Sequence, residues 1–213
     1  VHEMTRRALL PWYNAFSFLK TYAEIDNWSP ETGLVKGENV LDRWMLSRLQ
    51  TLKQNVADEM SHYRLFNVVP QLFDFIEALT NWYIRLNRAR FWGSDMDQDK
   101  LSAFSTLYSV LLDLSKVMAP FAPFLSDYLY RELSALSGNR SAQESVHLCR
   151  FPNVDIENMV PELELAVDRM QQVILLGRQK RESVKIGLRT PLARITIINR
   201  DESLLEQMKS LEG

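Results

Sequence analysis

The sequence contains a single cysteine, Cys149, in 213 residues. One thiol rules out an internal disulfide framework and fits a reducing compartment. No apolar run approaches the ~20 residues that a membrane-spanning helix needs, and the start lacks a signal-peptide pattern. These absences favour a cytoplasmic protein with no membrane partner. Because the first residue is Val1 rather than methionine, we expect a piece of a longer protein.

The sequence also has little net charge, with a formal value of −2. No global electrostatic attraction to nucleic acid is available, so any such binding must come from local clusters of charge. Two clusters exist, one within residues 81–92 and one within residues 178–200. Hydrophobic residues make up 46% of the chain, which is enough for a real core.

The first part of the chain has the hydrophobic periodicity of helices. Apolar residues recur at steps of three or four in five segments. These segments lie at about 2–25, 41–63, 65–92, 101–118 and 125–136. Connections of ordinary length join them, so the pattern predicts a mainly α fold in which residues 1–140 form an antiparallel helical bundle.

The pattern changes in residues 141–213. Val146-His147-Leu148 and Ala193–Ile198 are typical of strands, and a helical run follows Pro161. Asp201 can cap a last short helix. A single strand needs partners, so this part is expected to be a small, truncated α/β unit.

The stretch from Leu79 to Gly93 carries an unusual surface. On an ideal helix one side is apolar, while Asn81, Arg85, Arg88 and Trp92 share another side. No acidic residue occurs between Glu77 and Asp95. Guanidinium groups grip phosphates and an indole stacks on a base, so this face suits RNA with unstacked bases. The alternative is an ordinary solvated face with Trp92 under a loop.

Arg90 stands apart from this face, because by angle it points to the apolar side of the same helix. It must extend to solvent, find a carboxylate partner, or lie where the helix frays.

Two patterns resemble metal sites but lack residues that such sites require. Asp95, Asp97 and Asp99 alternate, yet the glycine and glutamate that an EF-hand loop requires are replaced by Lys100 and Thr106. A solvated loop whose last aspartate caps the next helix is the better interpretation. His147 and Cys149 have no second pair of ligands, so no zinc site is expected either.

Several segments in the same order resemble the C-terminal anticodon-binding domain of class I isoleucyl-tRNA synthetases. They cover nearly the whole chain. They are Trp12–Phe18 (WYNAFSF), Leu41–Leu49 (LDRWMLSRL), Asn81–Arg85 (NWYIR), Arg90–Trp92 (RFW), Ala119–Phe124 (APFAPF), Ser145–Leu148 (SVHL) and Gly177–Leu192, which ends in RTPL. One departure is that Gly187 and Thr190 replace a lysine and a glutamine usual in the family.

The resemblance implies a module of a ligase that joins isoleucine to its tRNA. In the parent enzyme that reaction uses ATP and magnesium. The family's His-x-Gly-His and Lys-Met-Ser-Lys-Ser elements are absent here, and the three histidines, His2, His62 and His147, form no such element. We therefore expect no cofactor and no activity in this fragment alone. Its expected partner is the anticodon stem-loop of tRNA(Ile), and it is expected to be monomeric.

The resemblance also suggests where the RNA binds. Base-facing roles go to Asn14, Phe18, Arg90 and Trp92. Phosphate contacts go to Arg85, Arg88, Lys180, Arg181, Lys185 and Arg189. The alternative for Asn14 is a core amide satisfied by a backbone carbonyl, and the alternative for the whole chain is a helical protein-interaction module with no RNA role.

Overall fold

The computed structural model describes residues 2–138, 142–198, 200 and 205. It divides into two compact units, Val1–Met159 and Val160–Gly213. Each unit is described by itself below.

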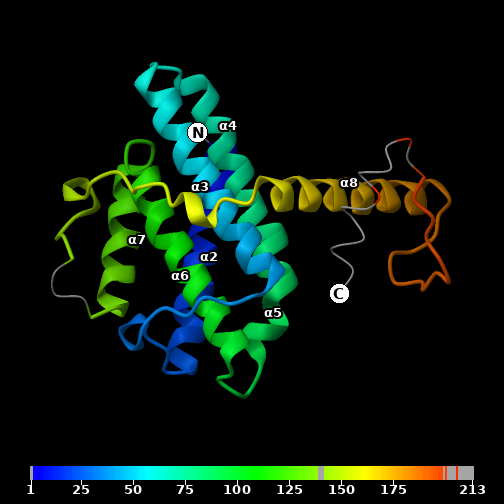
Figure 1. Cartoon of the computed structure of the whole chain (residues 1–213), viewed down its shortest axis with the longest axis horizontal. Helices are drawn as coiled ribbons and strands as arrows, with labels where there is room; N and C mark the ends of the chain where they lie inside the picture. Colours follow the sequence, from blue (N-terminus) through cyan, green and yellow to red (C-terminus); the bar gives the residue numbers. More distant parts are fainter. Residues whose placement is uncertain (1, 139–141, 199, 201–204, 206–213) are drawn as a thin grey trace. The chain divides into compact units, whose positions relative to one another are not determined.

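Unit 1 is a helical bundle, and each of the five expected helical segments is found in it (Figure 1). The first segment comprises α1 (His2–Met4), the π-helical η1 (Thr5–Leu9) and α2 (Leu10–Ile25). It is followed by the short η2 (Pro30–Thr32), α3 (Val40–Ser61), α4 (Leu65–Glu77), the π-helical η3 (Ala78–Ile84) and α5 (Arg85–Trp92). The unit continues with α6 (Gln98–Met118), α7 (Pro123–Leu136), η4 (Val146–Leu148) and η5 (Ile156–Asn158).

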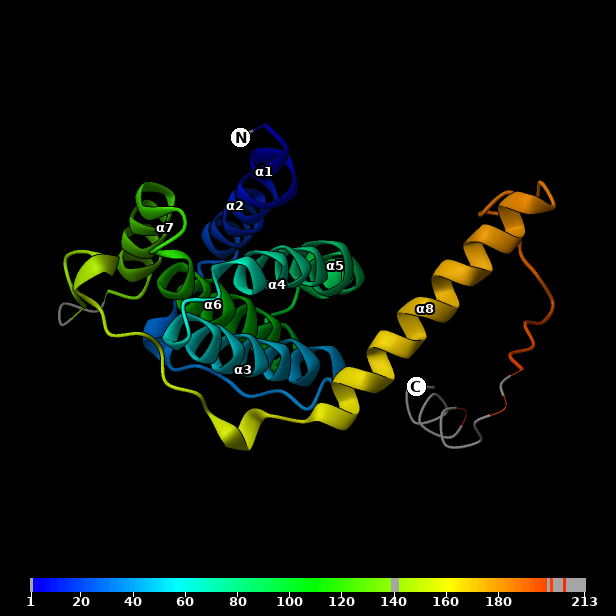
Figure 2. The same cartoon turned by 90° about the horizontal axis from the view of Figure 1, so that it is seen from above.

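Helix α6 forms the centre of the bundle and lies among α2, α3 and α7 (Figure 2). Its sequence is apolar or small on nearly every side, which explains why most of its residues are buried. The amphipathic helices around it turn their apolar faces inward. The largest side chains that this burial encloses are Trp12, Trp44, Tyr83, Phe75, Phe91 and Phe104.

The third helical segment contains the π-helical turn η3, which the hydrophobic pattern did not predict. A π turn holds more residues than an α turn, so residues after it are displaced relative to the core. At regular α-helical spacing Leu86 would share the apolar side with Leu79 and Tyr83, but Leu86 is 56% exposed and Asn87 is 2% exposed. The Thr80 hydroxyl donates to the Ile76 carbonyl at 2.8 Å, and carbonyls beside a π turn are the ones that lose their usual N–H partner.

The loop before α6 also differs from the prediction in one detail. Asp97, not Asp99, is the N-cap, because its carboxylate accepts a hydrogen bond from the Lys100 N–H at 2.8 Å. Asp99 instead pairs with Arg90. Within the described ranges, no cluster of three or more His, Cys, Asp and Glu side chains could hold a metal ion.

Unit 2 contains the long helix α8 (Pro161–Ser183) followed by an irregular segment. The two strands expected after residue 140 are wrong: Val146–Leu148 is a single 3-10 turn in unit 1, and residues 193–198 are irregular. The β-branched composition near Ile197 favours extended backbone, but the described part of the chain offers it no pairing partner. The predicted cap Asp201 lies outside the described residues. No helix in the described ranges has the length and apolar character required to span a bilayer.

Candidate nucleic-acid groove

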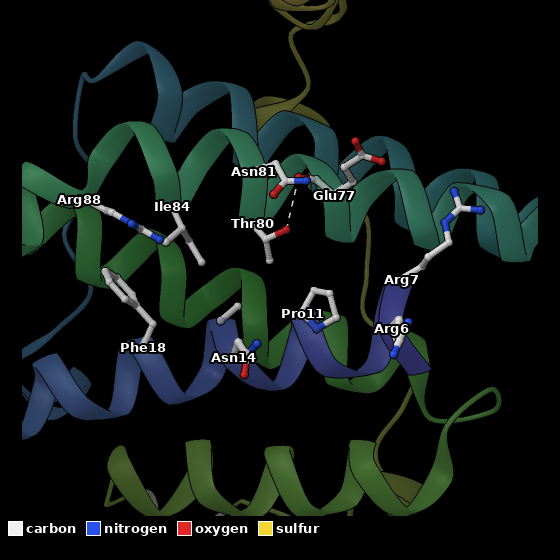
Figure 3. Close-up of a pocket in the computed structure, with 11 residues that line it drawn as sticks. Arg6, Arg7, Pro11, Asn14, Phe18, Glu77, Thr80, Asn81, Ile84 and Arg88 are labelled. Atoms are coloured by element: carbon white, nitrogen blue, oxygen red, sulfur yellow. Dashed lines mark hydrogen bonds between the residues drawn. The ribbon is translucent and has the colours of Figure 1, made fainter. Parts of the chain in front are cut away.

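A groove of about 500 Å³ runs along unit 1 between the first and third helical segments (Figure 3). One wall is formed by η1 and α2, and the other by α4, η3 and α5. Its lining residues are Arg6, Arg7, Pro11, Asn14, Ala15, Phe18, Glu77, Thr80, Asn81, Ile84 and Arg88. The wall from Glu77 to Arg88 runs through three consecutive helical elements, so the groove is elongated.

Positive charge lies at both ends of the groove. Arg6 and Arg7 are at one end and Arg88 is at the other (Figure 3). Arg7 makes only a weak exposed pair with Glu3, at 3.5 Å, and lies 5.6 Å over the Phe73 ring. In the part of the chain that the structure describes, Arg6 and Arg88 have no ion pair. These guanidinium groups are therefore available to an anionic ligand.

Between these ends the groove carries hydrogen-bonding amides, with one carboxylate, that of Glu77, on the side nearer Arg7 (Figure 3). Asn14 projects from α2 and Asn81 from η3, and both side chains are exposed. Neither amide makes a hydrogen bond to any other described residue. The alternative of a buried, satisfied Asn14 is therefore wrong. Each amide offers two donors and one acceptor, which is the chemistry needed to read the edge of an unpaired base.

Aromatic rings continue the groove beyond Arg88. Phe18 packs against Tyr22 with ring centroids 4.8 Å apart, and Tyr22 accepts a hydrogen bond of 2.6 Å from Trp92 Nε1. Trp92 is still 58% exposed. The interpretation that Trp92 lies under a loop is wrong, and its indole presents a stacking surface.

Arg90 does not face the groove, in contrast to its predicted base-facing role. Its guanidinium donates two hydrogen bonds of 2.8 Å to the carboxylate of Asp42, which is 1% exposed. It also donates to the Asp99 carboxylate at 2.8 Å and to the Asn87 and Ser102 side chains, both at 3.0 Å. All of its N–H groups are used within the protein, so none remains for a base. Of the possibilities open to Arg90, the carboxylate partner is the one observed.

The carboxylate of Asp42 is the centre of this network. Besides Arg90 it accepts from the Tyr83 hydroxyl at 2.7 Å and from the Ser102 hydroxyl at 3.0 Å. Burial and the adjacent carboxylate raise the pKa of Tyr83 well above its ordinary value, so the phenol remains a donor. Burial alone would lower the pKa of Arg90, but its hydrogen bonds to Asp42 and Asp99 outweigh that effect and raise it.

The backbone of Gly37 packs directly against the same network. A Cβ atom on Gly37 would collide with the Cβ and Oγ of Ser102 and would approach Asp42 Oδ2 to 3.2 Å. The loop between η2 and α3 can therefore pack directly on the network only because residue 37 has no side chain.

The structure thus brings together three of the predicted residues, Asn14, Phe18 and Arg88. Arg85 is exposed on α5 but does not line the groove. After the π turn, Ile84 rather than Arg85 lies on the wall of the groove. Sequence reasoning missed Arg6, Arg7 and Thr80. Their recruitment depends on the packing of η1 against α4, which no local pattern reveals.

The remaining predicted cations belong to unit 2. Lys180, Lys185 and Arg189 are exposed and make no ion pair within the described ranges. Arg181 is different, because its guanidinium donates to the backbone carbonyls of Gly187 and Thr190. It closes the loop that carries Lys185 and Arg189, whereas Lys180 lies on α8.

Comparison with known sequences identifies the fold. Residues 42–197 match the family described as the anticodon-binding domain of tRNA ligase. The chain belongs to this family. The wall formed by α4, η3 and α5 and the network around Asp42 lie within the matched residues, whereas the wall formed by η1 and α2 lies before them.

Similar proteins carry this anticodon-binding domain within much longer chains. The chain is 45% identical over 212 residues to an isoleucine–tRNA ligase of Bdellovibrio bacteriovorus, covering 100% of this chain and 20% of the relative. It is 40% identical over 226 residues to the cytoplasmic isoleucine–tRNA ligase of Saccharomyces cerevisiae, covering 100% and 21%. An isoleucine–tRNA ligase of Chlamydia trachomatis serovar L2 is 41% identical over 216 residues, covering 100% and 20%. The chain therefore spans about a fifth of the length of these relatives.

Proposed function

We propose that the groove of unit 1 binds the anticodon loop of tRNA(Ile), and that the chain is the anticodon-recognition part of an isoleucine–tRNA ligase. The observation that supports this proposal is the combination of arginines, amides and aromatic rings along one groove. Arg6 and Arg88, which have no ion pair among the described residues, lie at opposite ends, amides with no hydrogen bond to those residues lie between them, and an aromatic surface continues beyond Arg88.

Each part of the groove has a role in this proposal. Arg6, Arg7 and Arg88 hold backbone phosphates, which positions the RNA without reading its sequence. Asn14 and Asn81 contact base edges, and Trp92 stacks on an unpaired base. Bases in a hairpin loop are already unpaired, so this recognition does not require the protein to open a duplex.

The cations of unit 2 are assigned to phosphates of the same RNA. Lys180, Lys185 and Arg189 are exposed and suit a sequence-independent electrostatic role. Arg181 supports the loop that carries Lys185 and Arg189 rather than the RNA itself.

The relatives suggest the reaction that this recognition serves. The parent enzyme joins isoleucine to tRNA with the consumption of ATP, assisted by magnesium, on parts outside this domain. The domain itself supplies binding and orientation and no chemical step.

The proposal is tested by binding of a fluorescently labelled anticodon stem-loop of tRNA(Ile), measured at several salt concentrations. Replacing Arg88 with alanine should weaken binding and reduce the slope of log K against log salt by about one. Arg85→Ala is the matched control, because it removes the same charge from the same helix outside the groove. Equal effects of the two variants, or equal binding of a stem-loop with a changed anticodon, would contradict the proposal.

A further inference from the structure

The direction of the Arg88 side chain is related to that of Arg90, whose own side chain does not face the groove. Arg88 and Arg90 are two positions apart on α5, and two positions on an α-helix correspond to a rotation of ~200°. Arg90 is fixed on the core side by Asp42, so Arg88 is turned to the opposite side, where the groove lies. Trp92 is two positions beyond Arg90 and is turned outward for the same reason.

Helix α5 has two buried residues, Asn87 and Phe91, so its apolar packing on the core depends on the single ring of Phe91, which lies 5.0 Å from the Phe18 ring and 5.1 Å from the Phe104 ring between centroids. The helix continues directly from the π turn η3, with αR backbone at Ile84 and Arg85, so its rotation about the helix axis depends on that turn. Its inward face has an amide, Asn87, where an apolar residue is usual. A regular α turn in place of η3 would bury Leu86, which is now exposed, and would rotate Arg88 away from its present direction.

The contacts of Arg90 connect α5 to the two helices that form its support. Asp42 belongs to α3, and Asp99 and Ser102 belong to α6. Lysine, which carries the same charge, cannot replace Arg90 in these contacts. Lysine provides three donors around one nitrogen and cannot reproduce the flat, two-pronged contact with Asp42 together with the contacts to Asp99 and Ser102.

We propose that Arg90 and Asp42 are positioning residues for RNA binding, and that their ion pair fixes the rotation of α5 so that Arg88 faces the groove. This inference rests on the proposed function of the groove. It assigns to the Asp42–Arg90 pair a role in recognition that goes beyond stability.

The test is a double-mutant cycle on binding of the labelled stem-loop, using the wild type, Arg88→Ala, Arg90→Lys and the double variant. Arg90→Lys keeps the buried charge of Asp42 paired, so the domain should remain folded; circular dichroism confirms this. Arg88→Ala should weaken binding about tenfold in the wild type and less than about twofold when residue 90 is lysine. Arg6→Ala, on the other wall, should cost the same factor in both backgrounds.

The outcomes separate the two claims. If Arg88→Ala has no effect in the wild type, the proposed function of the groove fails. If Arg88→Ala has its full effect in both backgrounds, the groove binds RNA but Arg90 does not position Arg88, and the inference is overturned.

A second measurement needs no RNA. Amide hydrogen exchange in Arg90→Lys should accelerate in residues 85–92 and remain unchanged in the middle of α6. Asp99→Asn, which keeps the contact between Arg90 and Asp42, should accelerate exchange much less. Unchanged protection of residues 85–92 in Arg90→Lys would also overturn the inference.

Discussion

Trp92 donates a hydrogen bond of 2.6 Å from its indole N–H to the hydroxyl of Tyr22 while more than half of its surface stays exposed. The bond fixes the ring by its edge and leaves a face open. Replacing Trp92 with alanine should weaken stem-loop binding by about 1–3 kcal/mol, the value of one base–aromatic stack. Fluorescence anisotropy measures this change.

Two further variants identify the origin of that effect. Trp92→Phe keeps an aromatic face and should retain most of the affinity. Phe66→Ala removes an exposed aromatic from the start of α4, which is not part of the groove lining, and should leave binding unchanged. An equal loss for Phe66→Ala would mean that general surface apolarity, not stacking at Trp92, drives binding.

The buried hydroxyl of Tyr83 stabilises the fold through the Asp42 carboxylate. Tyr83→Phe removes a hydrogen bond to a charged acceptor and should lower the free energy of unfolding by about 1.5–3 kcal/mol. Urea denaturation measures the change. Tyr128→Phe, at an exposed tyrosine whose hydroxyl has no hydrogen-bond partner among the described residues, should cost close to nothing.

Thr80 should contribute to stability through its hydroxyl rather than its shape. Thr80→Val keeps the volume but leaves the Ile76 carbonyl without this donor, so the free energy of unfolding should fall by about 1 kcal/mol. Thr80→Ser, which retains the hydroxyl, should be close to wild type at this bond. If serine and valine destabilise equally, the hydroxyl is not the cause.

Asp127 gives the fold a pH dependence. Its carboxylate accepts hydrogen bonds from the Ser145 hydroxyl and from the Val146 N–H at 3.0 Å, and pairs with Arg131 at 2.8 Å. The Ser145 hydrogen bond is the main cause that lowers the pKa of Asp127. The resulting stability is present above the ordinary aspartate pKa of about 3.9 and is lost as the pH falls through the lowered value.

Thermal unfolding of Asp127→Asn and wild type between neutral and acid pH tests this. The variant should be less stable by about 1 kcal/mol at neutral pH, and the difference should shrink as the pH falls below about 4. A difference that stays constant down to the most acid pH would show that the charge of Asp127 does not matter.

The helical bundle could be predicted from the sequence because the spacing of apolar residues along an amphipathic helix identifies its buried face. Helix α3 is an example, with apolar residues at regular steps that become its buried face. The same method failed at η3, since it assumes a constant 3.6 residues per turn. The strand predicted near Ile197 failed for a related reason, because local composition cannot supply a neighbouring strand.

The groove could be predicted only in part. Asn14 and Phe18 were predicted from the family resemblance, and Arg88 lies on the polar side of a recognisable helix. Arg6 and Arg7 were not found, because their position depends on which segments pack together. The role of Arg90 could not be predicted from the sequence, because its partner carboxylate, Asp42, lies 48 positions earlier in the chain.

The closeness of Gly37 to Ser102 and Asp42 links the loop before α3 to the ion pair that holds α5. Any heavier residue at that position would push on the pair that orients α5. If the groove binds RNA as proposed, a substitution of Gly37 should weaken that binding from a distance, although residue 37 does not line the groove.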